Sequence, residues 1–255
     1  MKIVVFFLMF IFMITLLNAY ELISLSDTPT AGILQYGEVL ITTKMYRNNG
    51  ILIGGSVGLF SRFMFGVSYG GENIVGNETP NWHERVDVNA KYRIIDESPT
   101  LPAVVIGFDS QGHGVYHHSL NRYDIKSKGF YTAVSRNFYF LGNLGFHGGT
   151  NYSLENKDDQ KSINFFVGVD KSLGDELTLM LDYDFALNDK DPQSEELTFN
   201  ESLLKRRGNG YLNLALYLRF TEFLAVKFTA YDILENNRHT SGADRAVTIN
   251  YNMKF

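Results

Sequence analysis

Residues 245–255 read RAVTINYNMKF, and the regular alternation of this stretch decides the fold class. Successive side chains of a β-strand point to opposite faces of the sheet, so residues two apart share a face. One face here is apolar and holds Val247, Ile249, Tyr251, Met253 and Phe255. The other face is polar and holds Thr248, Asn250, Asn252 and Lys254. The stretch therefore predicts a strand with one apolar and one polar side.

The same alternation recurs along the chain. Eleven earlier runs show it, at residues 38–46, 51–60, 63–71, 85–95, 103–110, 129–140, 143–153, 162–173, 177–187, 210–220 and 224–234. A tilted strand needs about ten residues to cross the hydrocarbon layer of a membrane. We therefore expect one all-β domain over residues 38–255, a closed antiparallel up-and-down transmembrane β-barrel of about 12 strands.

The lengths of the connections predict the orientation of this barrel. Five connections are short, at residues 61–62, 96–100, 141–142, 174–176 and 221–222. The connections between them are mostly long and polar, at residues 72–84, 111–126, 155–161, 188–207 and 235–244. Short periplasmic turns and longer outside loops are typical of bacterial outer-membrane barrels, and an even strand number leaves both ends of the barrel in the periplasm.

Aromatic side chains gather at both ends of the expected strands. The short-turn end has Phe60, Phe63, Phe138, Phe140, Phe220, Phe223 and Phe255. The long-loop end has Tyr46, Tyr69, Tyr152 and Phe185. The two groups predict the aromatic girdles that mark both membrane interfaces.

The start of the chain has the layout of a secretory signal peptide. Lys2 precedes an apolar run over residues 3–17, and Leu17-Asn18-Ala19 ends it before the polar Tyr20-Glu21. The run is short for a helix that spans a membrane, so we expect residues 1–19 to be cleaved, with a retained anchor as the alternative. Residues 20–37 have turn formers and no sustained period, which predicts a periplasmic lead-in segment.

The composition excludes several functional classes. The absence of cysteine excludes disulfides, a thiol nucleophile and cysteine metal ligands. The net charge of −5, with no basic stripe, gives no indication of a nucleic-acid partner. The mean hydropathy of −0.11, despite 45% hydrophobic residues, is typical of alternating apolar and polar positions. No pattern predicts a cofactor.

Several motifs carry a resemblance to a known family. They are GVSYGGENIVG at 66–76, GFDSQG at 107–112, IKSKGFY at 125–131, NYSLEN at 151–156, GVDKSL at 168–173 and GYLN at 210–213. Together they resemble largely uncharacterised Gram-negative outer-membrane β-barrels, and are similar to the barrel part of YjbH-type proteins, a family associated with exopolysaccharide production. The resemblance implies an outer-membrane location and supplies no catalytic motif. The expected partners are outer-membrane lipid, the barrel-assembly machinery, and a polysaccharide or small polar solute.

The polar faces of the strands collect charges of both signs. The candidate lumen-lining residues are Asp87, Lys91, Arg93, Asp170, Asp182, Asp184, Arg219, Lys227 and Lys254. Neither sign dominates, whereas a ring that selects ions usually has one sign. A ladder of ion pairs that fills the interior is therefore favoured over a solute-selecting pore, and both predict a structural or transport role.

Two alternatives belong to other classes. Asp182 and Asp184 share a face, and with His147 they could serve an outer-membrane hydrolase, although sequence spacing cannot bring them together. A soluble periplasmic β-barrel that binds a ligand is the alternative fold. His113, His117 and His118 could hold a metal, but solvated loop histidines are favoured, so no metal or catalytic residue is assigned.

Glycine is frequent on one part of the predicted lumen wall. The inward positions of two neighbouring strands are Gly54, Ser56, Gly58, Gly66, Ser68 and Gly70. Glycine in a strand interior packs nothing, so this wall leaves room inside the barrel. The room predicts either a water-filled passage along the wall or a plug, for which residues 20–37 are the best candidate.

Phe255 is the predicted assembly signal, because an aromatic C-terminal residue on the apolar face resembles the signal by which bacterial outer-membrane barrels are recognised for insertion. We expect deletion of Phe255 to lower the amount of heat-modifiable barrel in the outer membrane while export across the inner membrane continues. Gel mobility of unboiled membrane fractions measures this amount. Normal levels of barrel in the deletion strain would contradict the prediction.

Overall fold

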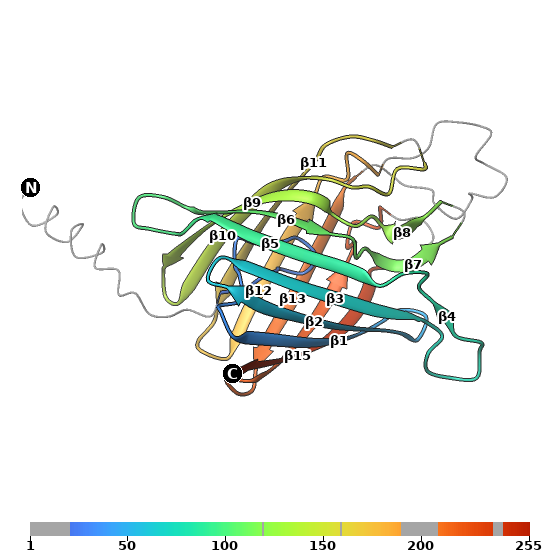
Figure 1. Ribbon diagram of the computed structural model, residues 1–255, viewed down its shortest axis with the longest axis horizontal. Coiled ribbons are helices and arrows are strands. Elements are labelled where there is room, and N and C mark those ends of the chain that lie inside the picture. The colour runs from blue at the N-terminus through green and yellow to red at the C-terminus, as the bar shows by residue number, and fades with distance from the viewer. Residues whose placement is uncertain (1–20, 119, 159, 190–208, 237–241) are drawn as a thin grey trace, which may run out of the picture.

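The computed structural model describes residues 21–118, 120–158, 160–189, 209–236 and 242–255 (Figure 1). The predicted signal peptide at residues 1–19 lies outside these residues. Among them there is no helix of the length and apolarity needed to cross a membrane.

Twelve strands form one closed antiparallel barrel, as the alternation predicts. They are β1 (Glu38–Tyr46), β2 (Gly50–Phe60), β3 (Phe63–Glu72), β5 (Asp87–Ile95), β6 (Ala103–Asp109), β9 (Gly129–Tyr139), β10 (Asn143–Tyr152), β11 (Asn164–Ser172), β12 (Leu177–Asp184), β13 (Tyr211–Arg219), β14 (Leu224–Tyr231) and β15 (Asp244–Lys254). Each pairs with its neighbours in chain order, and β1 also pairs with β15, which closes the ring. The short strands β4 (Asn81–Trp82), β7 (His113–His117) and β8 (Arg122–Ile125) lie in the connections.

Most large apolar side chains of the barrel strands point outward, away from the lumen. Tyr92, Leu181 and Tyr251 are 46%, 41% and 44% exposed, whereas Lys91 and Asp182, which neighbour the first two in sequence, are 5% and 1% exposed. A soluble barrel would bury its apolar face, so the alternative of a soluble periplasmic barrel does not fit this surface. A membrane barrel requires this arrangement, because lipid covers the outward face.

The connections follow the predicted pattern. The short turns between β2 and β3, β5 and β6, β9 and β10, β11 and β12, and β13 and β14 lie at one end of the barrel with the C-terminus (Figure 1). Tyr46 departs from the predicted outer girdle. Its side chain points into the barrel, where its hydroxyl donates to Glu72 Oε1 at 2.9 Å, because it shares the inward face of β1 with Lys44.

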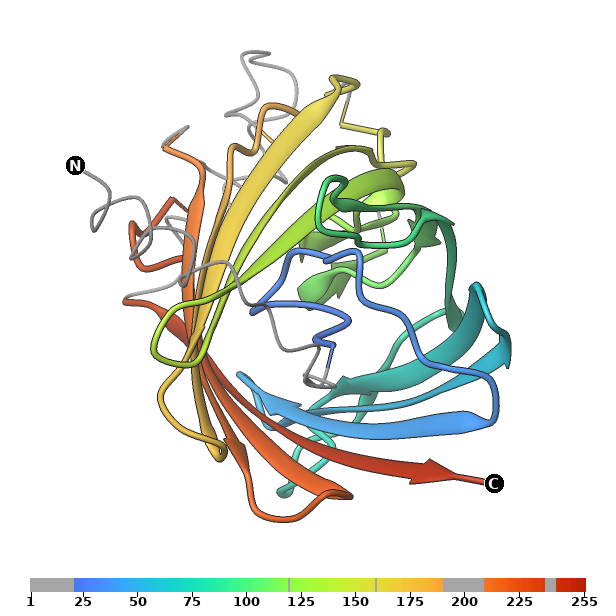
Figure 2. The same ribbon diagram turned by 90° about the vertical axis from the view of Figure 1, so that its left-hand side faces the viewer.

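Residues 21–35 lie inside the barrel (Figure 2), and we call them the inner segment. The sequence predicts a periplasmic lead-in over residues 20–37 and also gives these residues as the candidate plug, and the structure places residues 21–35 in the lumen, as a plug would be. They enter from the short-turn end, turn back at Leu25–Thr28, and leave along β2 to join β1. Leu25, Thr28 and Ala31 are fully buried.

The connection between β6 and β9 also folds inward, which the sequence did not predict. Strands β7 and β8 pair with each other, and we call them the outer hairpin. They lie at the long-loop end of the barrel (Figure 1). The prediction of solvated loop histidines is wrong for His113, which is only 4% exposed because it lies against buried polar partners. His83, in another long connection, is equally buried.

The outward face predicts how a charge affects stability. We expect Leu181→Arg, in the middle of β12, to cost about 2–4 kcal/mol of the free energy of unfolding in lipid vesicles, because an arginine at mid-membrane loses its hydration. Leu173→Arg, beside the short turn after β11, is the matched control and should cost about 0–1 kcal/mol. Denaturant titration of both variants measures the costs, and equal costs would contradict the lipid-facing assignment.

Candidate functional site in the barrel lumen

The inner segment forms a tight turn at its tip. The backbone N–H of Leu25 donates to the carbonyl of Thr28 at 2.9 Å, and Ser24 and Pro29 form an isolated antiparallel bridge. Such a turn uses few of its own backbone groups. The remaining N–H and carbonyl groups must find partners on the barrel wall, because buried backbone groups without partners are costly.

Asp182 on β12 holds the tip of the inner segment. Its Oδ2 accepts the backbone N–H groups of Ser26, Asp27 and Thr28 at 2.7, 3.0 and 3.4 Å. Its other oxygen accepts the side-chain amide of Asn213 at 2.7 Å. Hydrogen bonds to a carboxylate are roughly twice as strong as neutral ones, so this residue is a main anchor of the segment.

Three cationic side chains bind the carbonyl groups of the inner segment. Lys91 Nζ donates to Ile23, Thr30 and Gly32 at 2.7, 3.1 and 2.9 Å. Arg93 donates to the carbonyl of Ala31 at 2.8 Å and also forms an ion pair with Glu21. Lys227 Nζ donates to Leu25 at 2.8 Å. Charges that the sequence predicts as an ion-pair ladder thus bind an internal segment as well.

One carboxylate of the inner segment joins a buried ion-pair chain. Lys128, just before β9, lies 2.5 Å from Asp27 Oδ2 and 2.6 Å from Asp184 Oδ2. Burial alone would raise the pKa of Asp27, but the Lys128 ammonium outweighs it, with smaller contributions from His113 and Lys44, so the pKa of Asp27 is lowered. Burial alone would lower the pKa of Lys128, but Asp184 and Asp27 outweigh it, so this pKa is raised.

Apolar residues of the inner segment pack against apolar and aromatic residues of the wall. Ala31 lies in a buried cluster with Ala103, Val105, Tyr131, Ala133 and Phe166. Leu25 lies in a second cluster with Met180, Ala215, Tyr217 and Ala225. Ile33 and Leu34 lie in a third with Leu40 and Met64. Each of these three clusters therefore contains part of the inner segment.

Ser135, His147 and Asp170 form a hydrogen-bonded row across β9, β10 and β11. Ser135 Oγ lies 2.7 Å from His147 Nδ1, and His147 Nε2 lies 2.7 Å from Asp170 Oδ1. Ser135 Oγ also accepts the backbone N–H of Ala31 at 2.7 Å, so the row holds the inner segment.

This row differs from the predicted hydrolase set, because His147 pairs with Asp170 and not with Asp182 or Asp184. A cavity of about 40 Å³ lies beside it. That volume is enough for about one to three water molecules and too small for an ester or peptide. The row therefore positions Ala31, whose backbone N–H it binds.

The glycine wall is partly filled and partly accessible. A Cβ at Gly58 would lie 1.9 Å from the carbonyl oxygen of Gln35, so this glycine admits the inner segment. Gly66 similarly admits the side chains of Ser56 and Asn89. Neighbouring inward positions, namely Thr42, Gly54, Ser56, Ser68 and Asn89, stay partly accessible. We call these five residues the polar strip, and it lies on the wall opposite Asp182.

The outer hairpin reaches across the long-loop end of the lumen. His113 on β7 accepts a hydrogen bond from Lys44 Nζ at Nδ1 and donates from Nε2 to Asp244, each at 2.9 Å. Its ring stacks on Tyr231 with the centroids 3.9 Å apart. Burial and the adjacent Lys44 ammonium lower the pKa of His113. These contacts join the hairpin to β1, β14 and β15, far from β6 and β9, between which it arises.

The outer hairpin has two further buried attachments. Tyr123 on β8 donates its hydroxyl to Asp87 and also lies 3.2 Å from His83 Nδ1. Arg122 pairs with Asp158 at 2.6 Å and with Asp189 at 2.8 Å.

Among the described residues there is no cluster of three or more acidic or histidine side chains that could hold a metal.

The predicted lumen residues fall into three groups. Lys91, Arg93, Asp182 and Lys227 touch the inner segment directly, and Asp170 and Asp184 act through His147 and Lys128. Asp87 binds the outer hairpin. Arg219 and Lys254 lie at the short-turn end, where Arg219 binds the carbonyl of Asp175 and Lys254 is exposed.

Sequence reasoning missed several contributors, among them Lys44, Lys128, Ser135 and Tyr231. Lys44 and Ser135 occupy inward positions of predicted strands, so the alternation contains a signal for them. Lys128 stands at the junction of a loop and a strand, where the alternation gives no face. The aromatic ring of Tyr231 gave no sign that it would stack on a histidine.

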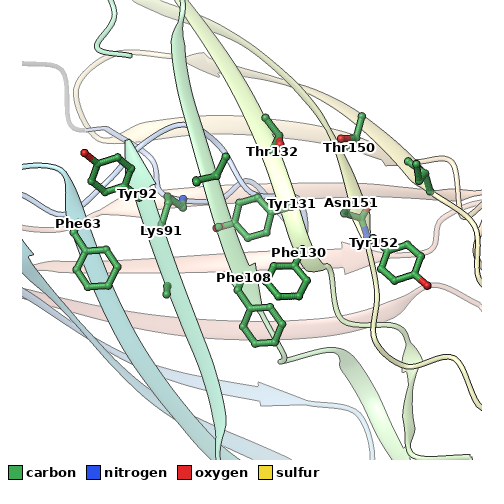
Figure 3. Close-up of a pocket in the computed structure, with 14 residues that line it drawn as sticks. Phe63, Lys91, Tyr92, Phe108, Phe130, Tyr131, Thr132, Thr150, Asn151 and Tyr152 are labelled. Carbon is green, nitrogen blue, oxygen red and sulfur yellow. The ribbon is translucent and has the colours of Figure 1, made fainter. Parts of the chain in front are cut away.

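An apolar groove of about 490 Å³ lies on the outward face of the barrel across β3, β5, β6, β9 and β10 (Figure 3). Aromatic rings of Phe63, Tyr92, Phe108 and Phe130 line it. Lys91 borders the groove, but its ammonium group binds the inner segment on the other side of the wall. The groove thus belongs to the lipid-facing surface and not to the lumen.

Comparison with known proteins gives similarity in fold only. No family model and no curated protein matches the chain. The solved KdgM porin is 8% identical, over 84% of this chain and 98% of that chain, with a TM-score of 0.47. The NanC porin is 9% identical, over 85% and 100% of the two chains, with a TM-score of 0.45. Omp33 of Acinetobacter baumannii is 12% identical, over 87% and 99%, with a TM-score of 0.44. Nothing about solute or activity is transferred at these values.

The three bonds to Asp182 predict that this carboxylate holds the inner segment. We expect Asp182→Asn to raise the hydrogen-exchange rates of the Ser26, Asp27 and Thr28 amides by about tenfold or more, because a neutral amide oxygen accepts these bonds more weakly. Exchange followed by mass spectrometry measures this. Asp87→Asn is the matched control, since Asp87 is equally buried but binds the outer hairpin. Equal exchange of the segment in both variants would contradict the role of Asp182.

Proposed function

We propose that the protein is an outer-membrane pore for small polar solutes, and that its own inner segment narrows the lumen. The observation that supports this most is the small size of many wall side chains behind the segment. Ala103, Ala133, Ala215, Ala225 and Gly168 all face it, and these small residues, beside larger ones such as Phe166 and Tyr217, leave the space that Leu25 and Ala31 occupy. Eight strands make a barrel that side chains just fill, so twelve strands with such a wall leave a channel unless another segment occupies it.

The outward surface supports the membrane location. Exposed Phe60, Phe140 and Phe220 stand at the short turns, and Tyr69 stacks on Trp82 near the long-loop end. Aromatic residues at both ends of an apolar band are typical of outer-membrane barrels. Secretion by the predicted signal peptide at residues 1–19 is part of this proposal.

The polar strip supports a small solute. Its residues carry hydroxyl groups, an amide and glycine, so they can bind water and uncharged polar groups along the side of the lumen that the inner segment leaves partly free. The outer hairpin covers the far end, where Gln111 accepts a hydrogen bond from Ser68 at 3.0 Å. A passage bounded by the two inward segments suits small molecules.

Export of an envelope polysaccharide, which the resemblance to YjbH-type proteins implies, is a further proposal. A polymer needs a wider path than the polar strip, so both inward segments would have to leave the lumen. The small-solute pore requires no such movement of the outer hairpin and is the function we favour.

Conductance of the purified protein in planar bilayers tests the proposed pore. We expect a small single-channel conductance for the chain that begins at residue 20, and a several-fold larger one when residues 21–34 are removed, because the lumen then fills with water. Shortening the outer hairpin by joining residues 111 and 127 should have a smaller effect while the inner segment is in place. Removing both should give the largest conductance.

Folding of each variant is checked by heat-modifiable gel mobility before recording. In a second version of the experiment, the protein folds with the segment in place and loses it afterwards. The intact protein is folded first and then cut at a protease site placed at Tyr36, which is 68% exposed at the rim, and the segment is washed out in mild denaturant. No conductance from any folded form would overturn the pore and leave a structural role.

A further inference from the structure

The wall that receives the inner segment is positively charged. Four cationic side chains of the wall touch the segment, namely Lys91, Arg93, Lys128 and Lys227. Two wall carboxylates accompany them, Asp182 at the tip and Asp184 beside Lys128. These four positive and two negative charges give the seat a net charge of +2, and the nearby Lys44 and Asp109 add one charge of each sign. The polar strip, whose Asn89 is the inward neighbour of Lys91 on β5, carries no charge.

The inner segment supplies the complementary groups. Glu21 pairs with Arg93, and Asp27 pairs with Lys128, so each carboxylate of the segment occupies a cationic position on the wall. Carbonyl oxygens of the segment accept hydrogen bonds from Lys91, Arg93 and Lys227. The segment thus presents two carboxylates and a set of acceptor oxygens to the lumen wall, as a bound anionic molecule would.

We propose that this seat is a binding site for solutes that carry two carboxylates, and that the inner segment occupies it as a built-in competitor. The inference rests on the proposed pore, because a solute reaches the seat only through the lumen. Lys91 and Arg93 lie two residues apart on the inward face of β5, and among the described residues neither pairs with a wall carboxylate. When the segment leaves, these two cations lose their partners and attract an anion.

Two features favour an anion over other solutes, and the neighbouring Lys91 and Arg93 offer one cation to each of two carboxylates. A cation would meet the net positive charge of the seat, and Asp184 is already paired with Lys128. A neutral sugar would leave the buried guanidinium of Arg93 without a charged partner. Arginine and carboxylate groups match in geometry, since the guanidinium presents parallel N–H donors to two carboxylate oxygens.

Binding of succinate to the protein freed of residues 21–34 tests the proposal directly. Isothermal titration calorimetry in detergent should show saturable succinate binding to the freed protein. The intact chain should bind succinate at least about tenfold more weakly than the freed protein, because the segment competes. The freed Lys91→Gln/Arg93→Gln variant should also bind at least about tenfold more weakly than the freed protein. Lys171→Gln is the matched control, because Lys171 binds turn carbonyls at the short-turn end and should leave succinate affinity unchanged. Equal affinity for succinate in the freed protein and its Lys91→Gln/Arg93→Gln variant would overturn the proposal, as would absence of binding.

Ion selectivity provides a second readout. In a potassium chloride gradient the freed protein should favour chloride over potassium, and Lys91→Gln/Arg93→Gln should bring the two permeabilities closer together. Millimolar succinate should block chloride current in the freed protein only. Cation preference in the freed protein would overturn the proposal.

The two measurements separate the two hypotheses. Succinate binding that depends on Lys91 and Arg93, without conductance, would overturn the pore and support the site. Conductance without succinate binding would support the pore and overturn the site. The protein cut at Tyr36 after folding gives the same comparisons if the shortened chain does not assemble.

Discussion

Every second residue of a membrane barrel strand faces lipid, and every other residue faces the lumen, so inward polar groups have only each other, water or an inserted segment as partners. In this protein the inserted segment is part of the same chain. Asp182 shows the consequence most clearly, since one carboxylate oxygen receives three consecutive backbone N–H groups from residues 26–28. Carbonyl groups of the inner segment accept hydrogen bonds from the lysines of the wall, and Asp182 of the wall accepts those of the segment's turn.

Burial of so many charges is favourable only where they are paired. Removing one member of a buried pair typically costs about 3–5 kcal/mol, because the other remains without a partner. Lys128 lies between Asp27 and Asp184, and Arg122 lies between Asp158 and Asp189, so each cation serves two carboxylates from different parts of the chain. The first set fixes the inner segment and the second fixes the outer hairpin. The lumen is therefore narrowed from both ends by elements that depend on the same kind of interaction.

The barrel was predictable from the sequence because it follows from a local period. The alternation places all twelve strands within a few residues of their observed bounds, and the outward direction of Leu181 and Tyr251 follows from the same period. Tyr46 was assigned to the wrong side, although its even position in β1, with Lys44, indicates the lumen. The alternation therefore also indicates inward residues, such as Tyr46, that were not assigned to the lumen.

The contents of the lumen were only partly predictable. The glycines of β2 and β3 indicated room for a plug, and Gly58 does admit Gln35. The row of Ser135, His147 and Asp170 depends on the register between three strands, which sequence spacing does not provide. The outer hairpin depends on contacts such as His113 with Asp244, 131 residues apart, and no local period encodes them.

An engineered disulfide tests the position of the inner segment most directly. The chain has no cysteine of its own, so two introduced cysteines can pair only with each other. A Cβ at Gly168 would lie 2.3 Å from Leu25 Cδ1, so cysteines at these two positions are close enough to join. In the Leu25→Cys/Gly168→Cys variant, mild oxidation of the folded barrel should give a disulfide that mass spectrometry detects and reductant removes. The control variant Leu25→Cys/Gly54→Cys has its second cysteine on the opposite wall and should not cross-link. Rapid maleimide labelling of both thiols in the first pair, without a disulfide, would show that the segment lies outside the lumen.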